Sequence, residues 1–299
     1  MSAAIPDTPV TVLALIDQMA ARLEEAGLSF ADGFGHGTTN AFDEAAWLVL
    51  WQLGLPVDDL DSVENLPVAH VEQARVATLF DARITTRKPA AYLTNEAWLM
   101  GVPFYVDERV IIPRSFIAEL LIEGSIDAWL SEATQHVLDL CTGNGSLAVL
   151  AAMTYPDVRV DAADISADAL AVARINVDRH QLNSRIALIQ SNGLAACPGH
   201  YDLILCNPPY VNTASMAALP AEFRAEPSLA LAGGADGMDF IRSLFLTIAV
   251  QMNENAVLVL EIGNERVNFE SAFPHLEPLW FETSAGPDQV LLLTREQLN

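Results

Sequence analysis

Apolar residues recur every three or four positions in the N-terminal part of the chain, as in "TPVTVLALIDQMAARLEEAGL". This spacing places them on one face of a helix, and Thr8 and Pro9 suit its cap and first turn. Two further helices are predicted over residues 41–55 and 68–87. No strand pattern alternates with these helices, so residues 1–89 are predicted to form a separate helical domain.

A different pattern covers residues 90–113. Aromatic and β-branched residues surround a glycine and two prolines in "AWLMGVPFYVDERVIIP". Such a stretch predicts a short β-hairpin, which would connect two domains. A helix is then expected within "PRSFIAELLIEGSIDAWL".

Strand-like and helix-like runs alternate over residues 114–299. The predicted strands are "HVLDL", "VRVDAADI", "RIALIQ", "YDLILC" and "AVLVLEIG", and the helices between them include one capped by Ser166 and one over residues 239–252. This alternation predicts an α/β domain with a mostly parallel, doubly wound sheet. "PLWFETS" and "GPDQVLLLTRE" are expected to add a hairpin at the end.

Composition narrows the function classes. The 299 residues include 39 acidic and 15 basic ones, a net charge of −24, and Lys88 is the only lysine. Such a protein repels polyanions and attracts cationic partners, so extended nucleic acid is disfavoured. Cys141, Cys197 and Cys206 show no CxxC spacing and the six histidines no paired ligand spacing, so we expect no metal. The N-terminus lacks a signal-peptide pattern and no membrane-spanning apolar run occurs, so we expect a cytoplasmic protein.

A glycine turn follows the first predicted strand, in "DLCTGNGSLA". Gly143 and Gly145 let the backbone approach a ligand closely beside the start of a helix. Asp164 ends the next strand, where a carboxylate can accept both ribose hydroxyls. "GNGSLA" also fits a dinucleotide-binding pattern, which leaves a nicotinamide or flavin cofactor open. Asp139 and Asn192 favour S-adenosylmethionine, because the first could receive its amino group or order the loop and the second would lie at the adenine edge.

The fourth predicted strand runs into "NPPY". Two prolines stop a strand and fix the backbone. The side-chain oxygen of Asn207 and the carbonyl of Pro208 offer two acceptors for a planar NH2 group, and Tyr210 could pack over that group or exclude water. An amide nitrogen is a poor nucleophile, so holding it before the activated methyl of a sulfonium would make catalysis a matter of positioning and electrostatics.

These motifs, with "AAYLTNEAWLMGVPFYVDERVIIPRS", resemble the HemK-like class I methyltransferases, which methylate glutamine side chains of proteins. The resemblance runs along nearly the whole chain. It is closest to the PrmB-type branch, which modifies a glutamine in the third protein of the large ribosomal subunit, through "GFGHGTTNAFDEA", "CTGNG", "LPAEFRAEPSLALAGGADGMDF", "LLLTREQL" and "IPRS". It implies a helical substrate-recognition domain at 1–89, a connecting hairpin at 90–113 and a Rossmann-like domain with a mixed seven-stranded sheet at 114–299.

The resemblance also implies roles for individual residues, with S-adenosylmethionine as methyl donor and S-adenosylhomocysteine as product. The cofactor-binding residues would be Asp139, Cys141, Thr142, Gly143, Asn144, Gly145, Asp164, Ile165, Asn192, Gly193 and Asn207. The catalytic residues that hold the glutamine would be Asn207, Pro208, Pro209 and Tyr210, with Arg114 and Glu226 supporting the pocket. This chain departs from most relatives at Cys141, where they have glycine, and at Asn192, where they have aspartate.

Four other functions share some of these sequence features. A glutamine methyltransferase of the release-factor branch would use the same site, and "IPRS" in place of "IPRPxTE" disfavours it. An N6-adenine methyltransferase also uses Asn-Pro-Pro-Tyr but needs a basic groove. A dinucleotide oxidoreductase would leave "NPPY" without a task, and a non-catalytic ribosome-assembly module would tolerate loss of Asn207, which is intact. The expected partner is a basic ribosomal protein, not nucleic acid or membrane, and both a monomer and a dimer remain open.

Overall fold

The computed structural model of the chain describes residues 10–29, 34, 37–220 and 222–299. The chain forms two compact units, one of Met1–Glu96 with Pro220–Ala225 and one of Ala97–Leu219 with Glu226–Asn299. The predicted hairpin is present as strands β1 (Glu96–Leu99) and β2 (Val102–Tyr105) and lies almost entirely in the second unit.

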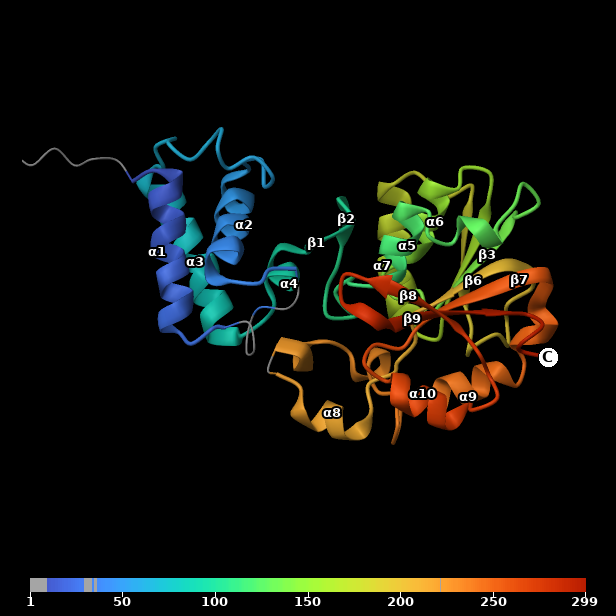
Figure 1. Ribbon diagram of the computed structural model, residues 1–299. Coiled ribbons are helices and arrows are strands. Elements are labelled where there is room, and N and C mark those ends of the chain that lie inside the picture. The colour runs from blue at the N-terminus through green and yellow to red at the C-terminus, as the bar shows by residue number, and fades with distance from the viewer. Residues whose placement is uncertain (1–9, 30–33, 35–36, 221) are drawn as a thin grey trace, which may run out of the picture. The chain divides into compact units, whose positions relative to one another are not determined.

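The first unit is helical (Figure 1). Its helices are α1 (Val12–Glu25), α2 (Ala41–Leu53), α3 (His70–Thr86) and α4 (Ala90–Thr94). The first three confirm the predicted helices, and one continuous apolar core lies between them. The short α4 was not predicted, because its few residues are too short a window for helical periodicity.

Local signals set the helix ends. The N-cap of α1 is Thr11, whose side chain accepts a backbone N–H, and the predicted cap residues Thr8 and Pro9 lie outside the described residues. Asn40 caps α2 in the same way, as residues with short polar side chains do at helix starts. Gly54 ends α2 with φ 66°, a left-handed conformation that glycine adopts without strain.

A buried ion network lies in the helical unit. Arg83 Nε is 2.8 Å from Glu44 Oε1 and Arg83 Nη1 is 3.2 Å from Glu222 Oε1, and the three side chains are 0%, 4% and 1% exposed. Burial raises the pKa of the Glu44 carboxyl, although the charge of Arg83 opposes the shift. The free-energy cost of removing this carboxylate from water therefore exceeds the stabilisation that it gains from Arg83. Without Arg83 the buried charge would be strongly destabilising.

The second unit is built on a seven-stranded sheet with the order β5-β4-β3-β6-β7-β9-β8. The strands are β3 (His136–Leu140), β4 (Arg159–Asp164), β5 (Ile186–Gln190), β6 (Tyr201–Cys206), β7 (Met252–Glu261), β8 (Leu279–Thr283) and β9 (Gly286–Thr294). The first five in the order are parallel and β9 is antiparallel to both of its neighbours. The predicted mixed sheet and its C-terminal hairpin are confirmed.

Helices cover both faces of this sheet (Figure 1). One face packs against α5 (Ile117–Glu123), α6 (Ser146–Thr154) and α7 (Ala167–Arg179) and the other against α9 (Asp239–Phe245) and α10 (Arg266–Ala272). Ser166 caps α7 as predicted. The predicted helix over 239–252 is instead divided, because α9 ends early and a 3-10 turn follows. The remaining short elements are α8 (Thr213–Ala218) and the 3-10 turns Asp127–Trp129, Glu222–Ala225, Ser228–Ala230 and Ile248–Gln251.

The strand order places the ligand crevice. From β3 the chain continues to β4 and β5 on one side, and then crosses to β6 on the other side of β3. The loops after β3 and β6 therefore diverge at the carboxyl edge of the sheet, which is where open α/β sheets bind ligands. Leu140 and Cys206 are register partners at the ends of these strands, so the glycine loop and the "NPPY" corner start side by side.

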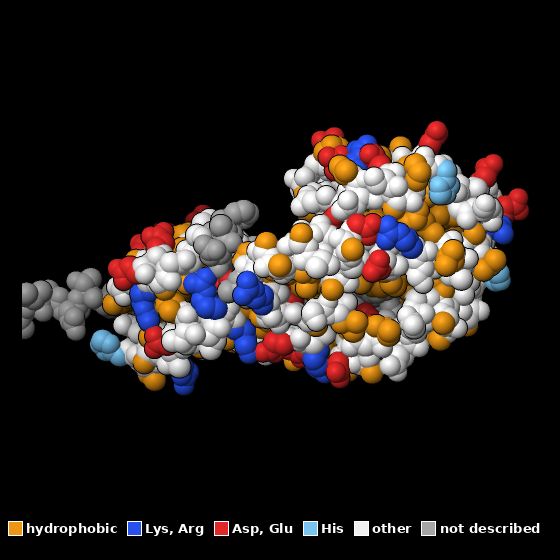
Figure 2. Space-filling model, turned by 90° about the horizontal axis from the view of Figure 1, so that it is seen from below, with side chains coloured by type: hydrophobic (Ala, Val, Ile, Leu, Met, Phe, Trp, Pro, Cys, Tyr) orange, Lys and Arg blue, Asp and Glu red, His pale blue; other side chains and the backbone are white. Residues whose placement is uncertain are grey.

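The surface of the second unit is not basic. In Figure 2 acidic and basic side chains are interspersed over the second unit, and the structure pairs Arg109 with Asp107 and Arg242 with Asp236. Within the part of the chain that the structure describes, no helix is long and apolar enough to span a membrane.

We expect Arg83→Ala to lower the free energy of unfolding by about 3–5 kcal/mol, because Glu44 would stay buried without its cation and Glu222 would keep only Arg87, at 3.0 Å. The matched control is Arg22→Ala, since the Arg22–Asp81 pair is 34% and 64% exposed and such pairs contribute about 1 kcal/mol or less. Urea denaturation followed by circular dichroism measures both variants. Equal losses would contradict a special role for the buried network.

Candidate active site

The glycine loop after β3 is shaped by left-handed backbone. Cys141, Gly143 and Gly145 have φ values of 64°, 55° and 81°. A Cβ on Gly143 would meet nothing within 4 Å, whereas one on Gly145 would lie 3.1 Å from the Cβ of Ala173 on α7. Gly145 thus permits close helix packing and Gly143 leaves the loop open toward a ligand. Cys141 holds a conformation that costs a non-glycine residue free energy.

The Asp139 carboxylate holds this loop in place through hydrogen bonds. Its side chain is 1% exposed, and Oδ2 accepts the hydroxyl of Thr142 and, at 2.9 Å, the N–H of Ala148 on α6. Burial raises the pKa of the carboxyl to about 7. Of the two roles that the sequence left open for Asp139, the ordering of the loop is the one for which the structure provides contacts.

Asp164 stands at the end of β4 with both oxygens fixed. Oδ2 accepts the N–H of Gly143 and Oδ1 accepts the N–H of Ser166, each at 2.9 Å. Burial raises the pKa of this carboxyl. Each oxygen keeps a further lone pair, so the group is oriented by the backbone and can still accept two neighbouring hydroxyls.

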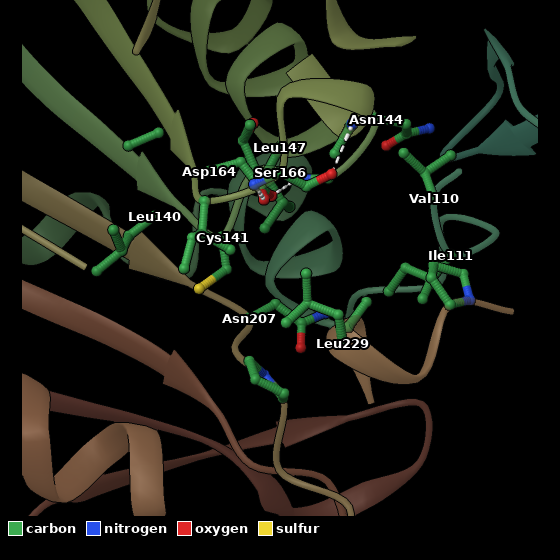
Figure 3. A pocket seen from close by; sticks show the side chains of 18 of the residues that line it. Val110, Ile111, Leu140, Cys141, Asn144, Leu147, Asp164, Ser166, Asn207 and Leu229 are labelled. Atoms are coloured by element: carbon green, nitrogen blue, oxygen red, sulfur yellow. Dashed lines mark hydrogen bonds between the residues drawn. The ribbon is translucent and has the colours of Figure 1, made fainter. Parts of the chain in front are cut away.

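One cavity in the second unit joins these parts. Figure 3 shows Asp164 and Cys141 on one side of it, Asn207 at the end of β6, and Val110 and Ile111 opposite. Of the predicted site residues, those that line the cavity are Arg114, Cys141, Thr142, Gly143, Asn144, Asp164, Ile165, Asn192, Gly193, Asn207 and Pro209. Those outside its lining are Asp139, Gly145, Pro208, Tyr210 and Glu226.

Sequence reasoning missed the apolar wall of the cavity. Val110, Ile111, Leu229 and Phe240 line it, and each lies in a stretch that the sequence pattern treats as a connection or an ordinary apolar run. No polar motif marks these positions, because a wall that excludes water is chemically indistinct from a core. The only signal in the sequence is their position near recognisable motifs, next to "IPRS" and in the loop that follows "NPPY".

The "NPPY" corner holds an amide that the protein itself does not use. The Asn207 side chain is half-buried in the cavity wall, and none of the described residues forms a hydrogen bond with it. Pro208 is buried behind it. An unpaired donor and acceptor in such a position are available to a ligand.

Three glycines fix Tyr210, the last residue of the corner. A Cβ on Gly263 would lie 2.5 Å from its ring, one on Gly237 2.3 Å from its carbonyl oxygen, and one on Gly233 2.7 Å from its Cα. Side chains at these positions would displace the corner, so glycine is required there for space. The sequence analysis did not assign these glycines, although they stand in "GGADG" and "EIG".

Two buried carboxylates brace the cavity wall before α5. Glu226 accepts both Nη atoms of Arg114, at 2.5 and 2.6 Å, and the N–H of Ile112 at 2.9 Å, which gives the predicted supporting pair a defined geometry. Glu261, at the end of β7, accepts the hydroxyl of Ser115 at 2.6 Å and the N–H of the next residue at 2.9 Å. The sequence analysis missed Glu261, because a single acid at a strand end is not a motif.

Comparison with known proteins identifies the family. The pattern of the methyltransferase small domain matches residues 119–233. A ribosomal protein uL3 glutamine methyltransferase of Bordetella pertussis is 52% identical over 292 residues, covering 97% of this chain and 96% of that protein. One of Burkholderia pseudomallei is 49% identical over 298 residues, covering 96% of this chain and 95% of that protein. The chain belongs to the ribosomal protein uL3 glutamine methyltransferase family.

A solved structure supports the fold. The catalytic domain of hMettl16 aligns with a TM-score of 0.50 at 14% identity, covering 75% of this chain and 81% of that one. At this identity the likeness shows the Rossmann-like methyltransferase fold alone. The fold and the family membership predicted from the sequence are thus both confirmed.

The cavity fits the cofactor of this enzyme family. Asn144 is 3% exposed, and its Nδ2 has no hydrogen-bond partner among the described residues, which leaves a buried donor for a ligand carboxylate. Asp164 offers oriented acceptors to a ribose, and the open space at Gly143 admits a ligand beside the loop. An amino acid joined to a nucleoside, as in S-adenosylmethionine, matches this set of groups.

We expect Asp164→Ala to weaken binding of S-adenosylmethionine by about 10- to 100-fold, the range for lost hydrogen bonds to a charged group. Asp168→Ala is the control, since Asp168 is exposed in the first turn of α7. Isothermal titration calorimetry measures both. Because Asp164→Ala also frees the N–H of Gly143, Asp164→Asn provides a milder second variant. Unchanged affinity in both Asp164 variants would place the ribose elsewhere.

Proposed function

We propose that this protein transfers a methyl group from S-adenosylmethionine to the side-chain amide nitrogen of a glutamine in ribosomal protein uL3, and that the "NPPY" corner holds that amide. The observation that carries the proposal is the unpaired Asn207 amide, which opens into the same cavity as the glycine loop and Asp164. The relatives that match along nearly the whole chain are named for this reaction.

The cofactor would be held by three segments. The loop from Cys141 to Gly145 would hold its methionine part, Asp164 its ribose, and Asn192 with Gly193 its adenine. Asn192 is uncharged, so it would accept from or donate to the adenine edge without the ionic contribution of an aspartate. When bound, the cofactor supplies a methyl group activated by a positively charged sulfur.

The corner would prepare the glutamine nitrogen. The Oδ1 atom of Asn207 and the carbonyl of Pro208 would accept its two hydrogens, which restrains the NH2 group and directs its lone pair away from its own carbonyl. Because the close packing around Tyr210 keeps the corner from relaxing, the acceptors are oriented before the substrate arrives. The apolar residues Val110 and Leu229 would exclude water from the nitrogen. The rate gain expected from such placement alone is large.

Charge supports a basic protein as the substrate. The net charge is −24 and the basic side chains of the second unit in Figure 2 are interspersed with acidic ones, so a cationic partner is attracted and a polyanion is repelled. We assign substrate recognition to the helical unit. A partner that joins the ribosome places the reaction in the cytoplasm.

Asn207→Ala is expected to abolish methyl transfer, with a loss of at least about 100-fold, because the amide would no longer be held. Affinity for S-adenosylmethionine should change little. Asn183→Ala is the matched control, since Asn183 is exposed and contacts only Arg174 in the described structure. Transfer of a radioactive methyl group to uL3 and calorimetry with the cofactor provide the two readouts. Full activity of the Asn207 variant would refute the role of the corner.

The choice of substrate is tested by offering the protein each candidate substrate separately, with added DNA and RNA as further candidates. The protein is incubated with radiolabelled S-adenosylmethionine and either purified uL3 or a peptide chain release factor, and the labelled residue is located by mass spectrometry. We expect label on a glutamine of uL3 and none on the release factor. Label on the release factor alone would contradict the proposed substrate, and label on added DNA or RNA would contradict its class.

A further inference from the structure

Glu261 is a buried acid whose hydrogen-bond donors are all neutral. It is 1% exposed at the carboxyl end of β7. Oε2 accepts the hydroxyl of Ser115 at 2.6 Å and the N–H of Phe116 at 2.9 Å, and Oε1 lies 3.4 Å from the hydroxyl of Tyr210. Glu226, the other buried acid that holds the segment before α5, instead binds the guanidinium of Arg114.

The partners of the two carboxyl oxygens come from different segments around the site. Ser115 lines the cavity, on the segment that leads into α5. Tyr210 ends the "NPPY" corner, and its ring packs against Gly263, two residues beyond Glu261, where an added Cβ would lie 2.5 Å from the ring. The carboxyl therefore links the cavity wall to the residue that fixes the corner.

We propose that Glu261 is a positioning residue for the glutamine site, which in its carboxylate form holds Tyr210 and through it the acceptors at Asn207 and Pro208. The inference rests on the proposed function, since it concerns how that site is kept in place. It assigns Tyr210 to the support of the corner, in agreement with its position outside the cavity lining.

The protonation state of Glu261 sets the strength of this link. Oε2 already accepts two hydrogen bonds, so a proton would go to Oε1. A protonated Oε1 would donate to the Tyr210 oxygen, and the tyrosine must then turn its own proton away. The 3.4 Å separation is long for an O–H···O bond, so the link gains much of its strength from a charged acceptor. The carboxylate therefore holds Tyr210 more strongly than the neutral acid does.

Burial brings this change near neutral pH. It raises the pKa of Glu261 to about 7, with the bonds from Ser115, the backbone and Tyr210 acting in the opposite direction. Burial also raises the pKa of Tyr210, which keeps its hydroxyl protonated as a donor. Because the ionised acid holds Tyr210 more strongly than the neutral acid, activity should rise with pH through about 7.

Other charged and titratable groups nearby have their own partners. Arg114 and Glu226 pair beside Ser115. Glu265, before α10, accepts the side chain of Asn212, and Glu119 on α5 binds Ser284. Cys206, at the end of the neighbouring strand β6, has Cys141 as its partner. None of these is a hydrogen-bond donor to the Glu261 carboxyl in the described structure.

The test is the pH dependence of kcat for methyl transfer to uL3, measured from about pH 6 to about pH 8.5. For the wild type we expect a rise of about tenfold with a midpoint near neutrality. Glu261→Gln, which resembles the neutral acid at every pH, should be flat and about tenfold below the wild-type plateau. Tyr210→Phe removes the linked hydroxyl and should also flatten the rise. Glu265→Gln, the same change in another buried acid of the region, should keep it.

The outcomes separate this inference from the function on which it rests. A wild-type protein without activity on uL3 would refute the proposed function and the inference together. An active wild type whose pH rise persists in Glu261→Gln or in Tyr210→Phe would refute the positioning role alone. Calorimetry with S-adenosylmethionine checks that the variants are folded, and a cofactor affinity within about twofold of the wild type is expected. A purely structural role would lower kcat without changing its pH profile.

Discussion

The parallel pairing of β3 with β6 is the constraint on which the site depends. It sets the glycine loop and the "NPPY" corner at neighbouring strand ends, with Leu140 opposite Cys206. The cavity opens between these two loops, which diverge because the chain crosses from one side of β3 to the other between β5 and β6. A register shift of one residue would turn each strand's side chains to the opposite face and separate the carboxylate, the loop and the amide.

Buried acids do most of the local positioning around that pair of strands. Asp139 holds the start of α6, Asp164 holds the glycine loop, and Glu226 and Glu261 hold the segment before α5. In each case a carboxylate oxygen accepts a backbone N–H that a loop would otherwise leave unpaired. Carboxylates suit this task because one group accepts several donors at once. For Asp139, Asp164 and Glu261 the cost is a pKa raised by burial, so part of this framework is sensitive to pH near neutrality.

The sequence predicts the fold in detail and the site in part. Strong periodic runs such as those of α1 and β6 are recognisable alone, and the motifs identify the loops that bind ligands. The path of Pro220–Ala225, which belongs to the helical unit although it follows "NPPY" in the chain, has no local signal, and neither has the division of the helix after Asp239. Glu261 and Gly263 were missed for the same reason. Their importance arises from what lies beside them in space.

The polar atoms that the fold leaves unpaired support the functional reading more than any motif does. Folded proteins satisfy nearly all of their buried polar groups, because an unpaired one costs about 1–3 kcal/mol. In the second unit several carboxylates accept backbone N–H groups. Nevertheless Asn144 Nδ2 is buried without a partner and the Asn207 amide forms no hydrogen bond with the described residues, and both side chains lie in the same cavity. An apolar residue at position 144 would remove the unpaired Nδ2. Thr154 Oγ1 and Gln251 Oε1 of this unit are also buried without a partner in the described structure, but neither residue lines the cavity. That Asn144 Nδ2 and the Asn207 amide lie unpaired in one cavity, next to a backbone kept open by Gly143, is explained by a polar ligand that completes their hydrogen bonds when it enters.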